Sequence, residues 1–249
     1  MPLHRIFERP LHRVFHRFGE QYGDPTLPSP ATEYALDFDG VDDSAAVSAR
    51  TESMEPAGDF TAVVRFRFDG TYNASRYPKV FGSEGSSRDW SIWAHDTGIN
   101  RIFAYIDTSD DFAVVRGPAI GSGWRSAAMW RAGTSLYLRV DGTTYGPTTI
   151  SGDAITSSNM RVRLGRWGSD SISYFEGLIE RAAYWDGLLD GTNLAAQEAA
   201  IDAHFAGTVL TGSPDHAWAI NEGTGSTLTD VGSVGGATMN IIGATWVEV

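Results

Sequence analysis

Three aspartates are the best candidates for a metal site in this sequence. Asp39, Asp42 and Asp43 lie close together in a stretch that also contains Gly40 and is typical of a turn. Calcium binds roughly six to eight oxygen atoms, which come mainly from aspartate carboxylates and loop carbonyls. Aspartates also form turns without any metal, because their carboxylates accept hydrogen bonds from the following backbone. The spacing therefore favours either a calcium site or a turn-forming cluster, and calcium is the one cofactor candidate.

Aromatic residues in loops are the candidates for sugar binding. A ring can pack against the apolar face of a pyranose while nearby carboxylates or amides hydrogen-bond to the sugar hydroxyls. The aromatic residues in stretches typical of loops are Tyr72, Tyr77, Trp90 and Trp167. Loop aromatics also make subunit contacts, so this alternative stays open for each of them. Further tryptophans lie in strand patterns and are expected in the core, namely Trp124, Trp130, Trp185, Trp218 and Trp246.

Catalysis is not expected from the remaining carboxylates and histidines. Glu176 and Glu180 share one face of a predicted strand but lie about 13 Å apart along it, whereas glycosidases need carboxyl groups about 5–9.5 Å apart. The sequence lacks the Gly-x-Ser-x-Gly motif of many serine hydrolases. His95, His204 and His216 are expected at the surface or hydrogen-bonded, and the sequence alone pairs none of them with a serine. We therefore expect no enzymatic activity.

The composition excludes several classes of protein. The 249 residues carry 19 basic and 31 acidic side chains, and the resulting net charge of −12 argues against a nucleic-acid partner. The chain has no cysteine, which excludes disulfides and thiolate metal sites. No run approaches the roughly 20 apolar residues of a membrane span. A signal peptide is not expected either, because arginine or histidine repeatedly interrupts the apolar residues near the start.

The first 20 residues are expected to form a basic, amphipathic docking arm. Residues 2–9 and 10–17 repeat one pattern, in which apolar residues fall on one side of a helix and arginines recur on the other. A proline begins each copy and suits the first turn of a helix, so we expect a short helical arm. The docking residues are Leu3, Arg5, Ile6, Phe7, Arg9, Leu11, Arg13, Val14, Phe15, Arg17 and Phe18. Residues 21–33 are rich in proline and are expected to be an extended linker.

From residue 34 onward the apolar pattern changes from helical to strand-like. Apolar residues alternate with others over 60–68 and 102–106, and the run over 136–140 leads into Asp141-Gly142, a two-residue hairpin signal. Further strands are expected over 161–165 and 174–185, and one helix over Thr192–Phe205. The residues on the apolar side of that helix are Leu194, Ala195, Ala199, Ile201 and Phe205. Short strands with one peripheral helix predict an all-β, antiparallel two-sheet sandwich.

Several stretches of this region resemble laminin-G-like, concanavalin A-like jelly-roll domains. Residues 36–43 are similar to the opening strand of that family, and residues 124–142 are similar to its paired strands with an aspartate-glycine hairpin. Residues 164–166, 174–179 and 188–189 match its closing strands, and residues 217–246 resemble a segment often placed ahead of the opening motif. The resemblance covers residues 34–249 and implies a jelly roll that binds or displays without turnover. It also fits a calcium site at the rim of the sandwich.

Together these features favour a structural protein on the surface of a phage particle. The fold is usually extracellular, and a virion protein made in the host cytoplasm needs no signal peptide. We expect a capsid decoration, head fibre or tail fibre component that docks on other virion proteins through its arm. We also expect a homo-oligomer, with a trimer as the favoured state, and contacts with surface glycans. Two alternatives stay open, a free carbohydrate-binding lectin and a glycan hydrolase of the same fold.

Overall fold

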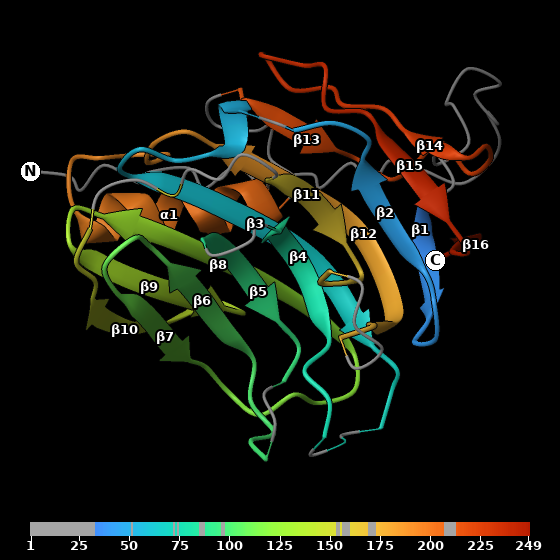
Figure 1. Ribbon diagram of the computed structural model, residues 1–249, viewed down its shortest axis with the longest axis horizontal. Coiled ribbons are helices and arrows are strands. Elements are labelled where there is room, and N and C mark those ends of the chain that lie inside the picture. The colour runs from blue at the N-terminus through green and yellow to red at the C-terminus, as the bar shows by residue number, and fades with distance from the viewer. Residues whose placement is uncertain are drawn as a thin grey trace, which may run out of the picture. The chain divides into compact units, whose positions relative to one another are not determined.

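Two antiparallel β-sheets packed face to face form the part of the chain that the structure describes (Figure 1). The computed structural model describes residues 33–249 except residues 51, 72, 74, 85–87, 96–97, 153–154, 156–159, 169–172 and 207–212. The predicted arm, with all of its docking residues, lies outside the described residues, as does the predicted linker apart from Glu33. None of the helices in the described part has the length and apolarity that crossing a membrane requires.

Each sheet has eight strands among the described residues. Sheet A contains, in spatial order, β10 (Thr143–Thr149), β9 (Ser135–Val140), β8 (Trp124–Ala132), β3 (Phe60–Phe68), β12 (Glu176–Trp185), β1 (Tyr34–Asp39) and β16 (Thr245–Glu248), and β13 (His216–Trp218) pairs with β12. Sheet B contains β14 (Thr227–Leu228), β15 (Met239–Ile242), β2 (Ser44–Val47), β11 (Arg161–Leu164), β4 (Lys79–Glu84), β5 (Asp89–Trp93), β6 (Phe103–Asp107) and β7 (Phe112–Arg116). The helices are η1 (Glu52–Met54), which is a 3-10 helix, and α1 (Leu194–Phe205). The predicted two-sheet sandwich with one peripheral α-helix is confirmed.

Alternate residues of the strands build the core between the two sheets. In β3, Phe60, Ala62, Val64 and Phe66 are fully buried, as the strand alternation predicts. Sheet B contributes Trp90 from β5, whose ring centroid lies 5.7 Å from that of Phe60. Large aromatic rings from both sheets therefore fill the centre of the sandwich.

The hairpin between β9 and β10 is the one that the sequence predicts. Asp141 and Gly142 have φ values of +48° and +79°, and a two-residue type I′ turn requires positive φ at both positions. The Asp141 carboxylate also ties the turn to β8, because its Oδ1 accepts a hydrogen bond from the Ser126 N–H at 2.9 Å. Its Oδ2 lies 2.6 Å from the guanidinium of Arg125. The turn is thereby fixed to the neighbouring strand as well as to its own hairpin.

Helix α1 covers the outer face of sheet A. Ile201 packs there in one cluster with Val63, Ala128 and Trp130 of the sheet. The sequence predicts that the helix begins at Thr192, but it begins at Leu194 because Asn193 is its N-cap. The Asn193 Oδ1 accepts a hydrogen bond from the Ala196 N–H at 3.0 Å.

The predicted apolar side of α1 is largely wrong. The buried residues of the helix are Gln197, Ile201 and His204, whereas Leu194 is 46% exposed. Gln197 can be buried because both ends of its amide have partners. Its Nε2 donates to Thr61 Oγ1 at 3.0 Å, and its Oε1 accepts from the Asp190 N–H at 2.9 Å. A satisfied amide therefore takes the place of an apolar side chain.

The closing segment, residues 213–249, returns the chain to its opening strands. β16 pairs with β1, so that Trp246 lies opposite Leu36. β15 pairs with β2, so that Ile241 lies opposite Ala45. The segment that resembles the start of other jelly rolls thus lies beside the opening strands. Its position at the end of the chain is compatible with the fold because the two ends of the described body are neighbours.

Candidate functional site

The outward side of sheet B carries aromatic and acidic side chains in a continuous set. Strand alternation turns Asp89, Ser91 and Trp93 of β5 away from the core, while Trp90 and Ile92 point into it. The neighbouring strands continue this set with Phe103, Tyr105, Asp107, Phe112, Val114 and Arg116. We call the outward-facing residues of β5, β6 and β7 the sheet B outer face. α1 packs on sheet A, on the other side of the sandwich.

Trp93 is the centre of an aromatic cluster that also contains Tyr77, Phe103 and Trp167. The rings of Trp93 and Phe103 stack with their centroids 5.7 Å apart and 2° between their planes. The ring centroids of Tyr77 and Trp167 lie 5.5 Å and 6.4 Å from that of Trp93. The Nζ of Lys79 lies 5.6 Å from the same ring, within the range of a cation–π contact. Trp93 itself is buried, whereas Tyr77 and Trp167 are half-buried and reach solvent.

A buried carboxylate ties Trp167 to the sheet. The Nε1 of Trp167 donates a hydrogen bond to Asp89 Oδ2 at 3.0 Å. Burial raises the pKa of Asp89 to about 6, while the charge of Lys79 and the indole hydrogen bond act in the opposite direction. Burial also lowers the pKa of Lys79 to about 8, and the charges of Asp89 and Glu84 oppose that change. Lys79 and Asp89 therefore stabilise each other's charged form beside the aromatic cluster.

Tyr105 and Phe112 form an open aromatic platform on the same face. Their ring centroids lie 6.4 Å apart with 28° between the planes, and Phe112 is 65% exposed. Asp107 lies opposite Phe112 on one side and opposite Asp89 on the other. The Tyr105 hydroxyl donates to Asp107 Oδ2 at 3.3 Å. Burial raises the pKa of Asp107, although the Tyr105 hydrogen bond and the charge of Arg88 lower it. The platform thus combines exposed ring surface with a carboxylate acceptor.

Two of the predicted sugar-binding residues, Tyr77 and Trp167, lie together at this site. The prediction for Trp90 is wrong, because Trp90 is on β5 and is fully buried in the core. Its Nε1 donates to the Met54 carbonyl at 3.2 Å, so that its one polar group is also satisfied there. Tyr72 lies outside the described residues.

Sequence reasoning missed the residues that complete the site on β5, β6 and β7. A signal for Phe103 and Tyr105 was present, because they alternate with the inward residues of the predicted strand over 102–106. For Trp93 the sequence has no such signal, because its outward position relative to Trp90 and Ile92 follows only once β5 is known to be a strand. The pairing of β6 with β7, which brings Phe112 beside Tyr105, has no local signal.

The tryptophans expected in the core divide into two groups. Trp130, Trp185 and Trp218 are buried, as predicted. Trp124 and Trp246 are only half-buried, which the prediction did not anticipate. The Arg65 guanidinium lies over the Trp124 ring, 5.3 Å from its centroid. The Trp246 Nε1 donates a hydrogen bond to the Gly225 carbonyl at 2.9 Å. Both therefore have polar partners that suit a position near the surface.

The predicted metal ligands Asp39, Asp42 and Asp43 come together at the turn between β1 and β2. One carboxylate oxygen of each lies within 4.8 Å of those of the other two. Asp39 Oδ1 accepts a hydrogen bond from the Val41 N–H at 2.8 Å, and Asp43 Oδ2 accepts one from the Asp39 N–H at 2.7 Å. These bonds are those of a turn-forming cluster. Three converging carboxylates also fit a hard, oxygen-binding cation, so calcium binding stays a prediction.

The three histidines named above are buried, and the expectation of a hydrogen-bonded histidine is confirmed for His216. His95 and His204 are 1% and 4% exposed and lie in the interior and not at the surface. His216 is fully buried and hydrogen-bonded through both ring nitrogens. Its Nδ1 meets the carboxylate of Asp230, and its Nε2 meets the hydroxyl of Ser53. The fold thus pairs a serine with a histidine that the sequence alone could not connect.

The chain is similar to solved proteins in fold and not in sequence. No protein-family model matches it, and no curated protein matches it either. A candidate carbohydrate-binding protein from Bacteroides ovatus superposes with a TM-score of 0.62 and 12% identity, over 88% of this chain and 60% of that chain. The CBM40 of the Ruminococcus gnavus IT-sialidase, bound to α2,3-sialyllactose, gives a TM-score of 0.50 and 13% identity, over 65% of this chain and 95% of its own.

A third similar structure is the heptameric SAP-like pentraxin of Limulus polyphemus. It has a TM-score of 0.50 and 12% identity, over 66% of this chain and 80% of its own. The protein has a concanavalin A-like jelly-roll fold. The jelly roll is the architecture that the laminin-G-like sequence resemblance predicts, and these likenesses concern the fold alone.

Proposed function

We propose that the protein is a glycan-binding module and that its sheet B outer face holds the sugar. The observation that carries this proposal is the platform of Tyr105 and Phe112 beside the Asp107 carboxylate. A pyranose can pack its apolar face on these rings while its hydroxyls donate to Asp107. Two of the structurally similar proteins, those from Bacteroides ovatus and Ruminococcus gnavus, are described as carbohydrate-binding, which supports the proposal.

The proposal is one of binding without cleavage of glycosidic bonds. Asp89 and Asp107 lie opposite each other on β5 and β6, and a pair of carboxylates is what a glycosidase needs. Asp89, however, is only 6% exposed, and its Oδ2 is occupied by the Trp167 indole. A carboxylate that holds a loop in this way has little access to a glycosidic oxygen. We therefore assign Asp89 to the support of the site and Asp107 to sugar contact.

A glycan array with purified full-length protein tests the proposal. The Phe112→Ala and Tyr105→Ala variants should each lose at least about tenfold in affinity for whichever glycans the wild type binds, equivalent to about 1.4 kcal/mol. Leu194→Ala is the matched control, because Leu194 is a large exposed apolar residue on α1. Its affinity should equal that of the wild type.

Two outcomes would contradict this assignment. Undiminished glycan binding by the double Tyr105→Ala, Phe112→Ala variant would remove the platform from the site. Release of reducing ends from a bound polysaccharide, lost in Asp107→Asn, would favour the alternative of a glycan hydrolase. Thermal unfolding of each variant shows whether a loss of binding reflects a loss of fold.

We further propose that the module is displayed on a phage particle and docks there through residues 1–20. The support is the repeated amphipathic pattern of residues 2–17, followed by a proline-rich spacer. Particles assembled with the full chain should carry it at their surface, as a homo-oligomer, whereas particles assembled with a chain that lacks residues 1–20 should not. Full occupancy by the shortened chain would refute the docking role and leave a free lectin as the better description.

A further inference from the structure

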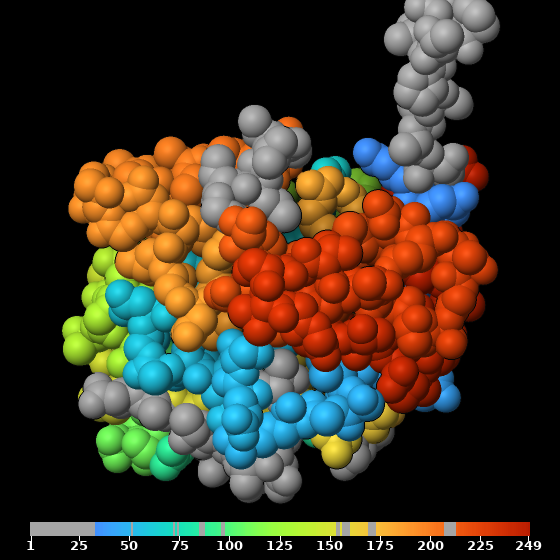
Figure 2. All heavy atoms as spheres, turned by 90° about the horizontal axis from the view of Figure 1, so that it is seen from above, coloured from blue at the N-terminus to red at the C-terminus, as the bar shows by residue number. Residues whose placement is uncertain are grey.

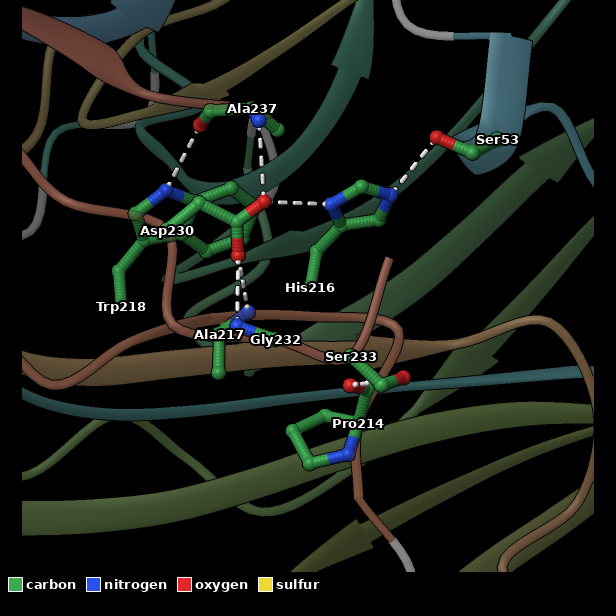
Figure 3. A network of polar contacts seen from close by, with 9 residues as sticks. All are labelled: Ser53, Pro214, His216, Ala217, Trp218, Asp230, Gly232, Ser233 and Ala237. Carbon is green, nitrogen blue, oxygen red and sulfur yellow. Dashed lines mark hydrogen bonds and ion pairs between the residues drawn. The ribbon is translucent and has the colours of Figure 1, made fainter. Parts of the chain in front are cut away.

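A serine, a histidine and an aspartate from three segments form a hydrogen-bonded chain (Figure 3). Ser53 lies in η1, His216 begins β13, and Asp230 follows β14. The Ser53 Oγ lies 2.7 Å from His216 Nε2, and His216 Nδ1 lies 2.7 Å from Asp230 Oδ2. Figure 2 shows the closing segment (red) running beside the part of the chain that contains η1 (blue). The fold therefore brings together groups that are far apart in the sequence.

Asp230 is held as a buried, ionised acceptor. Its side chain is fully buried, and its Oδ1 accepts hydrogen bonds from the N–H groups of Ala217 at 2.9 Å and Gly232 at 3.0 Å. Its Oδ2 accepts from the Ala237 N–H at 3.0 Å, as well as facing His216. Burial alone would raise the pKa of Asp230, but the bonds from His216 and the three backbone groups outweigh it and lower the pKa. An ionised carboxylate can only accept hydrogen bonds.

This arrangement fixes the tautomer of His216. Since Asp230 can only accept, the Nδ1 of His216 must carry the proton of their hydrogen bond. In the neutral ring the Nε2 then has a free electron pair, and it accepts a hydrogen bond from the Ser53 hydroxyl. The His216 ring is also held in place by Trp218, whose ring stacks on it with 6.3 Å between centroids. A base that is oriented by a buried carboxylate thus faces a serine hydroxyl.

We propose that Ser53 is a nucleophile toward carboxylic esters, with His216 as its general base and Asp230 as the positioning residue. Ser53 is exposed, whereas the two residues behind it are buried, so only the hydroxyl is presented to a reactant. The proposal goes beyond glycan binding, since it uses no residue of the sheet B outer face. An ester is the substrate class that these three groups suit, because its carbonyl is more electrophilic than that of an amide.

The reaction can be written with these groups alone and one water molecule. Ser53 Oγ bonds to the ester carbonyl carbon while its proton passes to His216 Nε2. The carbon–oxygen bond to the alcohol then breaks, and His216 returns the proton to the departing oxygen. Water attacks the acyl-Ser53 ester, gives a proton to His216, and releases the carboxylic acid as Oγ regains its proton. The hydrolysis neither oxidises nor reduces any group.

A fluorophosphonate probe, read by intact mass and peptide mapping, tests whether Ser53 is activated. The wild-type chain should gain one probe adduct at Ser53 and should hydrolyse p-nitrophenyl acetate faster than buffer. Ser53→Ala should lose the adduct and the hydrolysis, while Ser75→Ala, a change at another exposed serine, should keep both. His216→Asn should slow the labelling by about 100-fold or more. Thermal unfolding confirms that each variant is folded.

The role of Asp230 has its own spectroscopic readout. Proton NMR of the wild type should show a low-field His216 Nδ1–H signal, and Asp230→Asn should lose it together with the labelling. A wild-type chain that forms no adduct at Ser53 would overturn the proposal. An adduct that forms equally fast in His216→Asn would overturn it too, since Ser53 would then react without its base. Neither result would affect glycan binding at the platform, so the two proposals can fail separately.

Discussion

The turn between β1 and β2 gathers negative charge because two of its carboxylates are needed to form it. Asp39 and Asp43 accept backbone hydrogen bonds within the turn, and the exposed Asp42 adds a third charge beside them. Burial raises the pKa of Asp43, and the charges of Asp39 and Asp42 raise it further against the Asp39 N–H bond. A divalent cation would relieve this repulsion. The turn and the metal are therefore compatible uses of the same residues.

Calcium should raise the melting temperature of the wild-type protein through this cluster. A tenfold excess of calcium over its dissociation constant stabilises the folded state by about 1.4 kcal/mol, which corresponds to a shift of about 3–6 °C for a chain of this size. Asp42→Asn should abolish the shift, and Asp110→Asn, a change at another exposed aspartate, should not. Differential scanning fluorimetry with EDTA or calcium measures this. An unshifted wild type would leave the cluster as a turn alone.

Strands and helices differ in how far the sequence specified them. The alternation over 60–68 predicts the core side of β3, and Asp141-Gly142 predicts the hairpin between β9 and β10, because both signals are local. The alternation does not predict that Thr61 and Val63 on the other side of β3 are also fully buried, which follows from their contacts with α1. The buried side of α1 was not predictable, since the buried Gln197 amide is satisfied by two groups outside the helix, Thr61 Oγ1 on β3 and the Asp190 N–H. The candidate site behaves in the same way. Two of its aromatic residues could be predicted as loop residues, whereas the platform exists only once β6 and β7 pair.

The docking of α1 on sheet A should weaken as the pH falls, because of His204. Burial lowers the pKa of His204 to about 4 from 6.5, and the charge of Arg181 adds to this. Neither ring nitrogen has a hydrogen-bond partner among the described residues, and the ring packs against Trp185 at 5.3 Å. The unfolded chain takes up the proton below pH 6.5, whereas the folded chain resists it down to about pH 4. The contribution of neutral, buried His204 to the free energy of unfolding is thus complete above pH 6.5 and is lost as the pH falls from 6.5 to about 4.

His204→Leu should remove this part of the pH dependence. The wild type should lose up to about 3 kcal/mol of its free energy of unfolding between pH 6.5 and pH 4 on account of His204. The leucine variant should lose correspondingly less, and it should match the wild type at pH 7, because the histidine makes no hydrogen bond that leucine would forfeit. Urea titrations at several pH values measure the difference. Parallel pH profiles for the two proteins would exclude His204 as the cause.

At the level of the whole molecule, the closing segment joins both sheets to the opening strands. β16 extends sheet A beside β1, and β15 and β14 extend sheet B beside β2. Without them, β1 and β2 would be edge strands with unpaired backbone groups. Asp230 organises this segment, since its carboxylate binds the backbone of β13 at Ala217 and of the turn at Gly232 and Ala237. One side chain thereby holds the closing segment in the form that both sheets require.

Asp230→Ala should therefore be among the most destabilising single changes in this segment. It leaves three backbone N–H groups and His216 without their acceptor, which should cost about 3 kcal/mol or more. Because the folded state lowers the pKa of Asp230 below 3.8, its stabilisation is present above that pH and is lost as the pH falls further. The variant should thus differ most from the wild type at neutral pH and converge with it in acid. Chemical denaturation at pH 7 and pH 3 measures both effects.

Asp215→Ala provides the matched comparison for this prediction. Asp215 lies in the same segment, but within the described part of the chain its carboxylate accepts one backbone hydrogen bond, from the Asp186 N–H at 2.7 Å. Its loss should cost only about 1 kcal/mol. If the two variants were equally stable, the number of backbone bonds would not explain how the segment is held, and the strand pairing of β15 and β16 alone would have to close the jelly roll. A difference that follows the number of lost bonds would instead assign that closure to Asp230.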